Sequence, residues 1–198
     1  MSRLLAGKHA AIVGGTGAIG FPIARLFASH GARLTILSRS ALSKEPQLRP
    51  SLVSFKGAGN PGTQAGESEH RFINLDVGDP ADIKSKLRGK DPEREVGNVD
   101  LLVNCAGISQ TTVMERTSPE KIRDIIGTNL TATMLACKFA RMQRHGKTTP
   151  KASPPGCHSL LLGCIINVSS LMAEKAAVGA AAYTAAKAGV NGTSTFNS

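Results

Sequence analysis

The chain has 198 residues, 41% of them hydrophobic, with 21 glycines, no tryptophan and a formal net charge of +10. That length is enough for one domain with a proper core, and the composition is that of an ordinary soluble globular protein. The basic residues are spread without a run, and one tyrosine and six phenylalanines offer few rings to stack on bases, so the charge indicates an anionic cofactor or partner rather than nucleic acid.

The sequence also argues against a metal site and a membrane span. The four cysteines are Cys105, Cys137, Cys157 and Cys164, and no two of them form a Cys-x-x-Cys pair. We therefore expect neither bound metal nor disulfides, and a reducing compartment such as the cytoplasm or the mitochondrial matrix. No apolar run approaches the length required to cross a bilayer.

The chain begins with a predicted strand, glycine turn and helix. Residues 9–13 form a short apolar run that ends in the glycine-rich turn 14–20, and apolar residues then recur at helical spacing up to Gly31, which can cap the helix. Missing side chains in such a turn let the backbone approach a pyrophosphate at the positive end of the helix. The residues expected at this dinucleotide site are Gly14, Thr16, Gly17, Ile19 and Gly20.

The spacing of the turn fits more than one pattern. It can be read as Gly15-x-Gly17-x-x-Gly20, as Gly14-x-x-Gly17-x-x-Gly20, or as Gly14-x-x-x-Ala18-x-Gly20. All of these place phosphate at the same turn. No Lys-Ser/Thr pair follows the glycines, which disfavours a P-loop of the kinase type.

The second predicted strand, residues 33–37, ends in Ser38-Arg39. An acidic side chain at this place would accept hydrogen bonds from the ribose hydroxyls of NAD, and none is present. Ser38 and Arg39 are instead suited to a 2′-phosphate, so we predict NADP(H) rather than NAD(H). The alternative is that Arg39 is merely exposed at a strand end.

Residues 40–69 are rich in Pro, Gly, Ser and charge, and predict a long surface loop with at most one short helix. A third strand over residues 72–75 runs into Asp76-Val77, next to the cofactor site. Asp76 could bond the adenine amino group, or it could cap the helix expected to begin near Pro80.

A fourth strand over residues 99–103 leads into Asn104-Cys105-Ala106-Gly107. The small residues Ala106 and Gly107 would let the backbone pass beside the cofactor, and Asn104 could tie strand ends together. A long helical region, residues 118–144, then carries Asn129 among apolar residues. A buried Asn needs partners, and this one either changes the helix locally and holds a water for proton relay or is purely structural.

A second Pro-containing insertion, residues 146–163, precedes a strand at residues 160–168 that delivers Ser169-Ser170. Tyr183, the sole tyrosine, lies four residues before Lys187, so on a helix the two side chains share one face. An ammonium held beside a phenol stabilises the phenolate and lets the hydroxyl exchange a proton with a substrate oxygen. Ser170 could hydrogen-bond the same oxygen.

Together these residues resemble the short-chain dehydrogenase/reductase family, and within it the 3-oxoacyl-acyl-carrier-protein reductase and carbonyl reductase branch. The motifs that carry the resemblance are the turn at residues 14–20, Asp76-Val77, residues 104–107, Asn129, residues 167–170 and Tyr183-x-x-x-Lys187-Ala188-Gly189. The resemblance implies an α/β fold with a doubly wound parallel Rossmann sheet, of which about five strands are present.

What the resemblance implies for chemistry is hydride transfer from NADPH to a ketone carbon while Tyr183 protonates the oxygen. Ser170 would hold that oxygen, and Asn129 would belong to a proton relay. Tyr183 and Lys187 would also contact the cofactor, Lys187 at the nicotinamide ribose. The spacing to Tyr183 matches the family for Ser170, which leaves Ser169 structural. Arg144 resembles the place where relatives dock an acidic carrier protein, although an Arg that closes a helix is favoured by the helix dipole anyway.

The chain departs from the family after Gly189. Relatives continue with a full helix, two more parallel strands and a surface that forms oligomers, whereas here residues 190–198 are rich in poor helix formers. We expect one domain over residues 1–198 that lacks the C-terminal strands of the family, a short helix around Tyr183, and residues 160–168 at the sheet edge.

The sequence therefore predicts an NADPH-dependent reductase of a small ketone or of a 3-oxoacyl group on a carrier protein. The rival interpretation is a binding module without catalysis, which holds NADP(H) as a partner subunit. A nucleic-acid-binding protein is the third and weakest interpretation.

Overall fold

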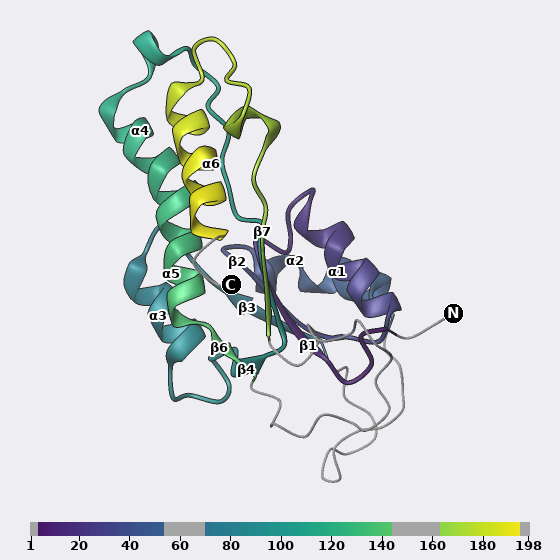
Figure 1. Cartoon of the computed structure of the whole chain (residues 1–198). Coiled ribbons are helices and arrows are strands. Elements are labelled where there is room, and N and C mark those ends of the chain that lie inside the picture. The colour runs from purple at the N-terminus through teal and green to yellow at the C-terminus, as the bar shows by residue number, and fades with distance from the viewer. Residues whose placement is uncertain (1–3, 54–69, 144–162, 195–198) are drawn as a thin grey trace, which may run out of the picture.

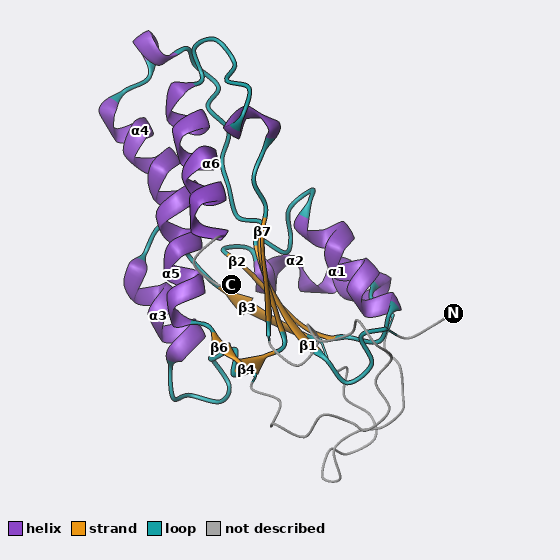
Figure 2. Cartoon of the chain, in the orientation of Figure 1, coloured by secondary structure: helices purple, strands orange, loops and turns teal. Residues whose placement is uncertain are grey.

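A five-stranded sheet with helices on both faces forms the centre of the computed structural model, which describes residues 4–53, 70–143 and 163–194 (Figure 1, Figure 2). The strands lie in the order β3-β2-β1-β5-β7 and every neighbouring pair is parallel. Their bounds are β1 His9–Val13, β2 Arg33–Ser38, β3 Arg71–Asn74, β5 Leu101–Asn104 and β7 Cys164–Asn167. A short parallel pair beside the sheet joins β4 Asn98–Val99 to β6 Arg141–Met142.

The helices cover the sheet in two layers. They are α1 Gly20–Ser29, α2 Ala41–Leu48, α3 Pro80–Arg88, α4 Pro119–Ile126, α5 Ala132–Phe139 and α6 Ala181–Ser194, with a π-helical turn at Gly127–Thr131 and short 3-10 turns at Arg49–Ser51, Met114–Arg116 and Leu171–Ala173. One core cluster packs α1 and α2 on one face, and a second packs α3 and α5 on the other (Figure 1). Parallel strands need this cover on both faces because neither face is polar.

The strand order reverses between β1 and β5. From β1 the chain crosses over α1 to β2 and then to β3 on one side, whereas β5 and β7 lie on the other side. In open parallel sheets the carboxyl ends of the strands at such a reversal leave a crevice for ligands. The predicted doubly wound Rossmann sheet is confirmed, and its switch point lies beside the glycine turn that follows β1.

The last strand behaves as a sheet edge, as its sequence predicts. Every residue of β1 is buried, whereas in β7 exposed and half-buried positions alternate, and Ile166 keeps 39% of its surface. Among the described residues β7 pairs only with β5. Within those residues, the outer side of β7 therefore lacks the cover that a central parallel strand has.

Residues 41–48 form α2, the one short helix that the sequence allows within residues 40–69, and a 3-10 turn follows it; Ala41 is fully buried against the sheet. One predicted boundary after it is wrong. The helix expected to reach residue 144 ends at Phe139, where Ala140 turns to extended backbone and the chain pairs with β4 instead. Residues 54–69 and 146–162 of the two expected insertions lie outside the described residues.

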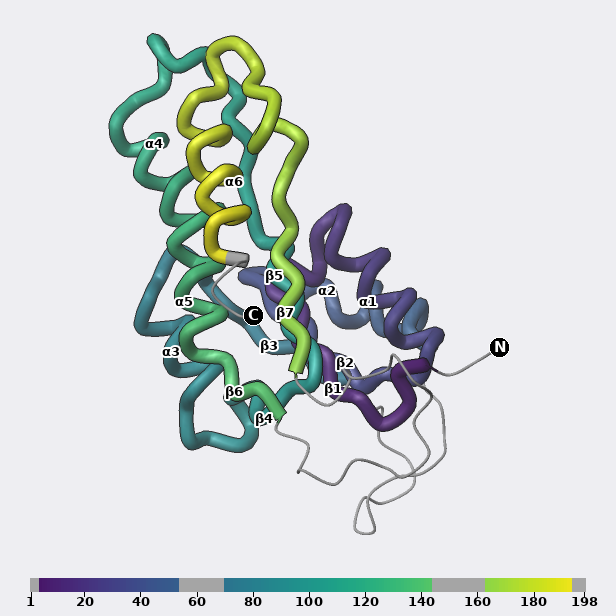
Figure 3. Tube along the Cα trace, in the orientation of Figure 1, coloured from purple at the N-terminus to yellow at the C-terminus, as the bar shows by residue number. Residues whose placement is uncertain are grey.

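The helix that carries Tyr183 and Lys187 is longer than predicted. It has 14 residues, and Ala182, Ala186 and Val190 form a buried stripe along it. A Cβ at Gly189 would lie 2.8 Å from the Leu130 side chain, so the glycine permits close packing where its low helix propensity predicts an end. Figure 3 shows α6 running beside α4 and α5.

A buried histidine at the start of β1 makes stability depend on pH. His9 is 4% exposed; its Nδ1 lies 2.7 Å from the Asn98 carbonyl oxygen and its Nε2 lies 2.8 Å from the Thr35 hydroxyl. This arrangement suits a neutral ring that donates from Nδ1 and accepts at Nε2. Burial, with the Arg33 charge second, lowers the pKa of His9 from 6.5 to about 4.

We expect the neutral ring to contribute its full stability above about pH 6.5 and to lose it as pH falls toward about 4, because the unfolded chain binds that proton first. The loss approaches about 3 kcal/mol at 1.36 kcal/mol for each pKa unit. Urea unfolding at about pH 7.5 and about pH 4.5 measures it, and His9→Gln should flatten the difference between the two. An unchanged difference in that variant would contradict the assignment.

Candidate functional site

A cleft of about 230 Å³ opens at the carboxyl ends of β1, β2 and β5, where the sequence places the dinucleotide. Three turns meet there: the glycine turn after β1, the end of β2, and the segment that follows β5. The lining residues are Gly14, Thr16, Gly17, Ser38, Arg39, Ser40, Leu75, Val77, Cys105, Ala106, Gly107, Ile108 and Thr128. Most of the predicted cofactor residues are thus brought together by the switch point.

The glycine turn has the backbone that its sequence predicts. Gly14 has φ of 80°, and a Cβ on it would lie 2.6 Å from the Ala106 amide nitrogen, so only glycine fits. The Gly17 amide donates to the Gly14 carbonyl at 3.0 Å, and α1 begins at Gly20 without an acidic residue in its first turn. The turn therefore presents a positive helix end that suits an anion.

Two residues of the glycine turn that were predicted for this site do not line the cleft. Ile19 is the residue before α1, is 57% exposed and is not among the lining residues. Gly20 is buried, and a side chain there would collide with the Gly14 carbonyl oxygen. Both residues shape the turn without forming its wall.

Hydroxyl groups gather beside Arg39 at the end of β2. Thr16 Oγ1 lies 2.8 Å from Ser38 Oγ and 3.4 Å from Ser40 Oγ, while Arg39 is exposed next to them. Ser40 precedes α2 but makes no side-chain hydrogen bond to cap it. Ser40 lines the cleft instead, a place that the sequence did not predict because a Ser before a helix is typical of an ordinary cap.

Asp76 and Val77 lie at the rim of the cleft, and only Val77 is one of its lining residues. The Asp76 carboxylate accepts the Gly78 amide at 2.9 Å and borders a neighbouring depression together with Arg39. The alternative role of Asp76 as the cap of α3 is wrong. Asp79 holds that position, and its carboxylate accepts the Ala81 amide at 2.8 Å.

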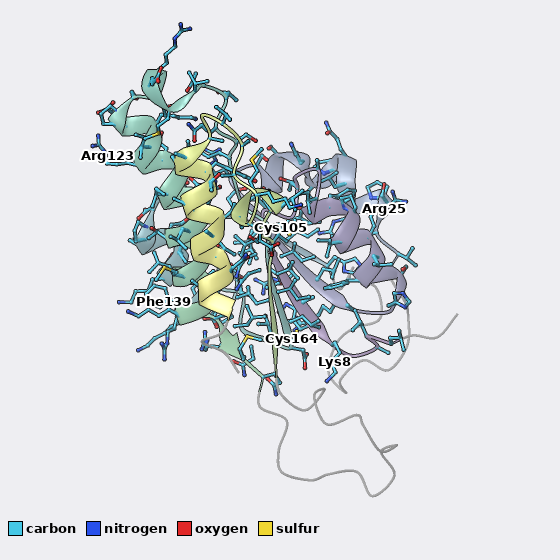
Figure 4. All side chains as sticks on the ribbon, turned by 45° about the horizontal axis from the view of Figure 1, so that its top comes forward. Lys8, Arg25, Cys105, Arg123, Phe139 and Cys164 are labelled. Atoms are coloured by element: carbon cyan, nitrogen blue, oxygen red, sulfur yellow. The ribbon has the colours of Figure 1, made fainter. Side chains whose placement is uncertain are left out.

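The segment after β5 reaches both halves of the sheet. Asn104 is 4% exposed and does not line the cleft; its Nδ2 donates to Asn167 Oδ1 at 2.8 Å, which joins the ends of β5 and β7. Cys105 does line the cleft, and Figure 4 shows it between α6 and the α1 side of the molecule. Burial raises the pKa of the Cys105 thiol to about 11, against the opposing pull of the Lys187 charge.

Asn129 lies in the π-helical turn and is fully buried. Its Oδ1 accepts the Ile108 amide at 2.7 Å, and its Nδ2 donates to the Ile108 carbonyl at 2.9 Å. Both side-chain groups are therefore used to hold the segment that lines the cleft. A Cβ on Gly107 would lie 2.9 Å from Asn129 Oδ1 and 3.8 Å from Lys187 Nζ, so these side chains converge behind the cleft wall.

A second cavity, of about 160 Å³, contains the proposed acid. Its lining residues are Ser109, Gln110, Ser170, Met172, Ala180 and Tyr183. Ser170 Oγ accepts the Met172 amide at 3.2 Å, which leaves its proton available to a ligand oxygen. Ser169 Oγ instead donates to the Lys187 carbonyl at 2.9 Å, on the backbone of α6.

Lys187 lies behind Tyr183 rather than in the cavity. It is 6% exposed, its Nζ donates to the Val168 carbonyl at 2.8 Å, and it lies 5.9 Å from the centre of the Tyr183 ring. Burial lowers the pKa of the ammonium, while Cys105 acts in the opposite direction. The amine of Lys187 therefore lies beside the phenol ring, as the i,i+4 spacing of the two residues on a helix predicts.

Some predictions fall on parts that the structure leaves undescribed. Arg144 lies outside the described residues.

Within the described ranges, no three His, Cys, Asp or Glu side chains lie close enough together to hold a metal ion. The helices of those ranges are all too short or too polar to cross a bilayer.

Comparison with known proteins agrees with this geometry. The sequence pattern of the short chain dehydrogenases matches residues 8–196. The chain is 33% identical over 185 residues to a mouse (Mus musculus) 3-oxoacyl-[acyl-carrier-protein] reductase, covering 93% of this chain and 65% of that protein. It is 28% identical over 188 residues to carbonyl reductase family member 4 of Xenopus laevis, with the same coverage.

A crystal structure of a dehydrogenase/reductase from Sinorhizobium meliloti superposes with a TM-score of 0.73 at 26% identity, covering 97% of this chain and 66% of that one. The chain thus spans about two thirds of the length of the relatives it matches. The family pattern matches nearly all residues of the chain, and the chain shares its fold with a solved dehydrogenase/reductase. The chain is a member of the short-chain dehydrogenase family.

Proposed function

We propose that the protein reduces a ketone, either a small carbonyl compound or a 3-oxoacyl thioester, to a secondary alcohol with NADPH as hydride donor. The observation that carries this proposal is the shared wall of the two cavities. Gly107 and Ile108 line the dinucleotide cleft, and the next two residues, Ser109 and Gln110, line the cavity that holds Tyr183. A substrate in that cavity would lie next to the reactive end of a cofactor in the cleft.

The residues of the cleft fit a dinucleotide. The Gly14 turn is a cradle that a side chain would fill, and the helix end beside it carries no opposing acid. A bound nicotinamide supplies the hydride, and the protein supplies position and proton. Lys187, whose buried ammonium lies behind the cleft wall, would bind the nicotinamide ribose.

The hydroxyl groups of the second cavity would deliver the proton. Tyr183 would give its proton to the substrate oxygen, and Ser170 would donate a hydrogen bond to the same atom. The Lys187 ammonium stabilises the phenolate that remains. Asn129 would belong to a proton relay, and its side chain holds the Ile108 segment of the cleft wall through two hydrogen bonds.

Preference for NADPH would follow from the end of β2. Arg39 supplies a planar cation, and the Thr16, Ser38 and Ser40 hydroxyls lie beside it as hydrogen-bond donors. The end of β2 carries no carboxylate to accept the ribose hydroxyls of NADH. In the same way the net charge of +10 favours substrates carried on an acidic protein.

A second candidate is a partner subunit that binds NADP(H) without catalysis. The exposed outer side of β7 favours this candidate, because it offers a surface to a partner chain. The chain spans about 65% of its first relatives, and a partner chain would supply the surfaces that complete the substrate pocket. Purified chain with NADPH and a small 3-oxoacyl ester separates the two. Cofactor binding with turnover supports the reductase, and cofactor binding without turnover supports the subunit.

Replacing the acid tests the reductase directly. We expect Tyr183→Phe to lower kcat by about 100-fold or more, because the proton donor is lost while the ring is kept. NADPH affinity should stay within about twofold of wild type, since the phenol lies in the second cavity. Turnover that survives in the variant would rule out Tyr183 as the donor.

Cofactor choice is tested at Arg39. Arg39→Ala should lower the affinity for NADPH relative to NADH by about 10- to 100-fold, because charge-assisted hydrogen bonds to a phosphate are lost. Arg25→Ala, on the exposed side of α1, makes the same change in net charge and should leave the ratio as in wild type. Equal effects of the two substitutions would show that only overall charge matters. Titration of both cofactors by fluorescence measures the ratio.

A further inference from the structure

A glutamine on the segment after β5 contacts the helix that carries Tyr183. The Gln110 side chain is half-buried, and its Oε1 accepts the backbone amide of Tyr183 at 3.2 Å. Its Nε2 donates to the carbonyls of Gly179 at 2.8 Å and Thr112 at 3.0 Å. One side chain therefore joins its own loop to both the start of α6 and the turn before it.

The start of α6 needs such a partner. The first amides of any helix lack acceptors within the helix, and Tyr183 is the third residue of α6. Ala180, which precedes the helix, has no side-chain oxygen with which to cap it. Gln110 supplies the missing acceptor from 73 residues away in sequence, in the role that a capping side chain usually fills from the helix itself.

The loop that carries Gln110 is itself fixed at two points. Asn129 holds the Ile108 backbone through two hydrogen bonds. On the other side, the hydroxyl of the buried Thr117 lies 3.2 Å from Gln110 Nε2 and donates to the Val113 carbonyl at 2.9 Å. The position of Gln110 is therefore set by the body of the protein, and α6 is aligned to it.

We propose that Gln110 is the residue that positions Tyr183, holding the first turn of α6 so that the phenol faces Ser170 across their shared cavity. The inference rests on the proposed reductase function for its catalytic meaning. Its structural part, the anchoring of Tyr183 by a side chain from the cleft wall, stands on the contacts alone. Loss of the anchor would let the first turn of α6 open and the phenol move.

The chain provides a clean probe, because Tyr183 is its only tyrosine and it has no tryptophan. Intrinsic fluorescence therefore reports on this residue alone. We expect Gln110→Met, which keeps the length of the side chain, to speed hydrogen exchange of the Tyr183 amide by about three- to tenfold, the loss of one hydrogen bond. Quenching of the tyrosine emission by acrylamide should rise with it. The matched control is Gln47→Met on the exposed side of α2, which should change neither.

A second variant separates anchoring from folding. Gln110→Glu keeps an acceptor for the Tyr183 amide and loses the donor to Gly179. The negative charge of the glutamate is favourable at the start of a helix. It should keep the amide protected to within about twofold of wild type. In turnover, Gln110→Met should lower kcat by about tenfold with the KM for NADPH unchanged, and Gln110→Glu should restore part of it.

Exchange at Tyr183 decides the inference whether or not the chain turns over. Unchanged exchange and quenching in Gln110→Met would overturn it, and so would equal loss of protection in Gln110→Glu. If wild type binds NADPH but shows no turnover, the reductase proposal fails, while faster exchange in Gln110→Met still supports the anchoring. If Gln110→Met does not fold, Gln110→Glu with a protected Tyr183 amide supports the inference, and an exposed amide overturns it.

Discussion

The close approach of two backbone turns at the sheet reversal is the constraint on which the site depends. Gly14, after β1, and Ala106, after β5, pass so close that a single methyl group on the glycine would lie 2.6 Å from a backbone nitrogen. That contact brings together a turn from the first half of the chain and a segment from the second. The cleft between them exists because β1 and β5 end at the same edge of the sheet, and the next strand after each lies on the opposite side of the pair.

From that contact the second segment continues along both cavities. Within four residues, from Gly107 to Gln110, it forms part of the wall of the dinucleotide cleft and then part of the cavity with Tyr183. Its backbone is held by Asn129 at Ile108, and its side chain at Gln110 holds α6. The two halves of the site thus share one short piece of backbone, and a shift in this piece would be felt by both.

Local sequence patterns were sufficient to predict the parts of the site that depend on local backbone. The glycine turn and the helical spacing of Tyr183 and Lys187 follow from residue types and periodicity, while the parallel sheet was expected from the family resemblance and is found. The hydroxyl of Ser40 and the side chain of Gln110 were not predicted. Each faces a partner 24 or 73 residues away, so neither leaves a local pattern.

The wrong boundary of α6 has a related cause. Residues 189–194 are poor helix formers, and propensity alone ends the helix near Gly189. Burial of Val190 and the contact of Gly189 with Leu130 outweigh that preference, because packing supplies most of the stability of short helices in proteins. Propensity could not show this, since the glycine that weakens an isolated helix is what permits the close contact here.

Leu130 belongs to the π-helical turn that interrupts the helix between α4 and α5. It is the neighbour of Asn129, so two adjacent residues of that turn point to different parts of the site: Asn129 to the Ile108 backbone and Leu130 to Gly189 on α6. A π-helical turn contains one more residue than a regular α-helical turn and is often found at functional sites. Through Asn129 and Leu130 the turn contacts both the loop of Gln110 and the helix of Tyr183, and Gln110 joins the two. A substitution at Leu130 or Gly189 would disturb the phenol through the helix that carries it, without contact with either cavity.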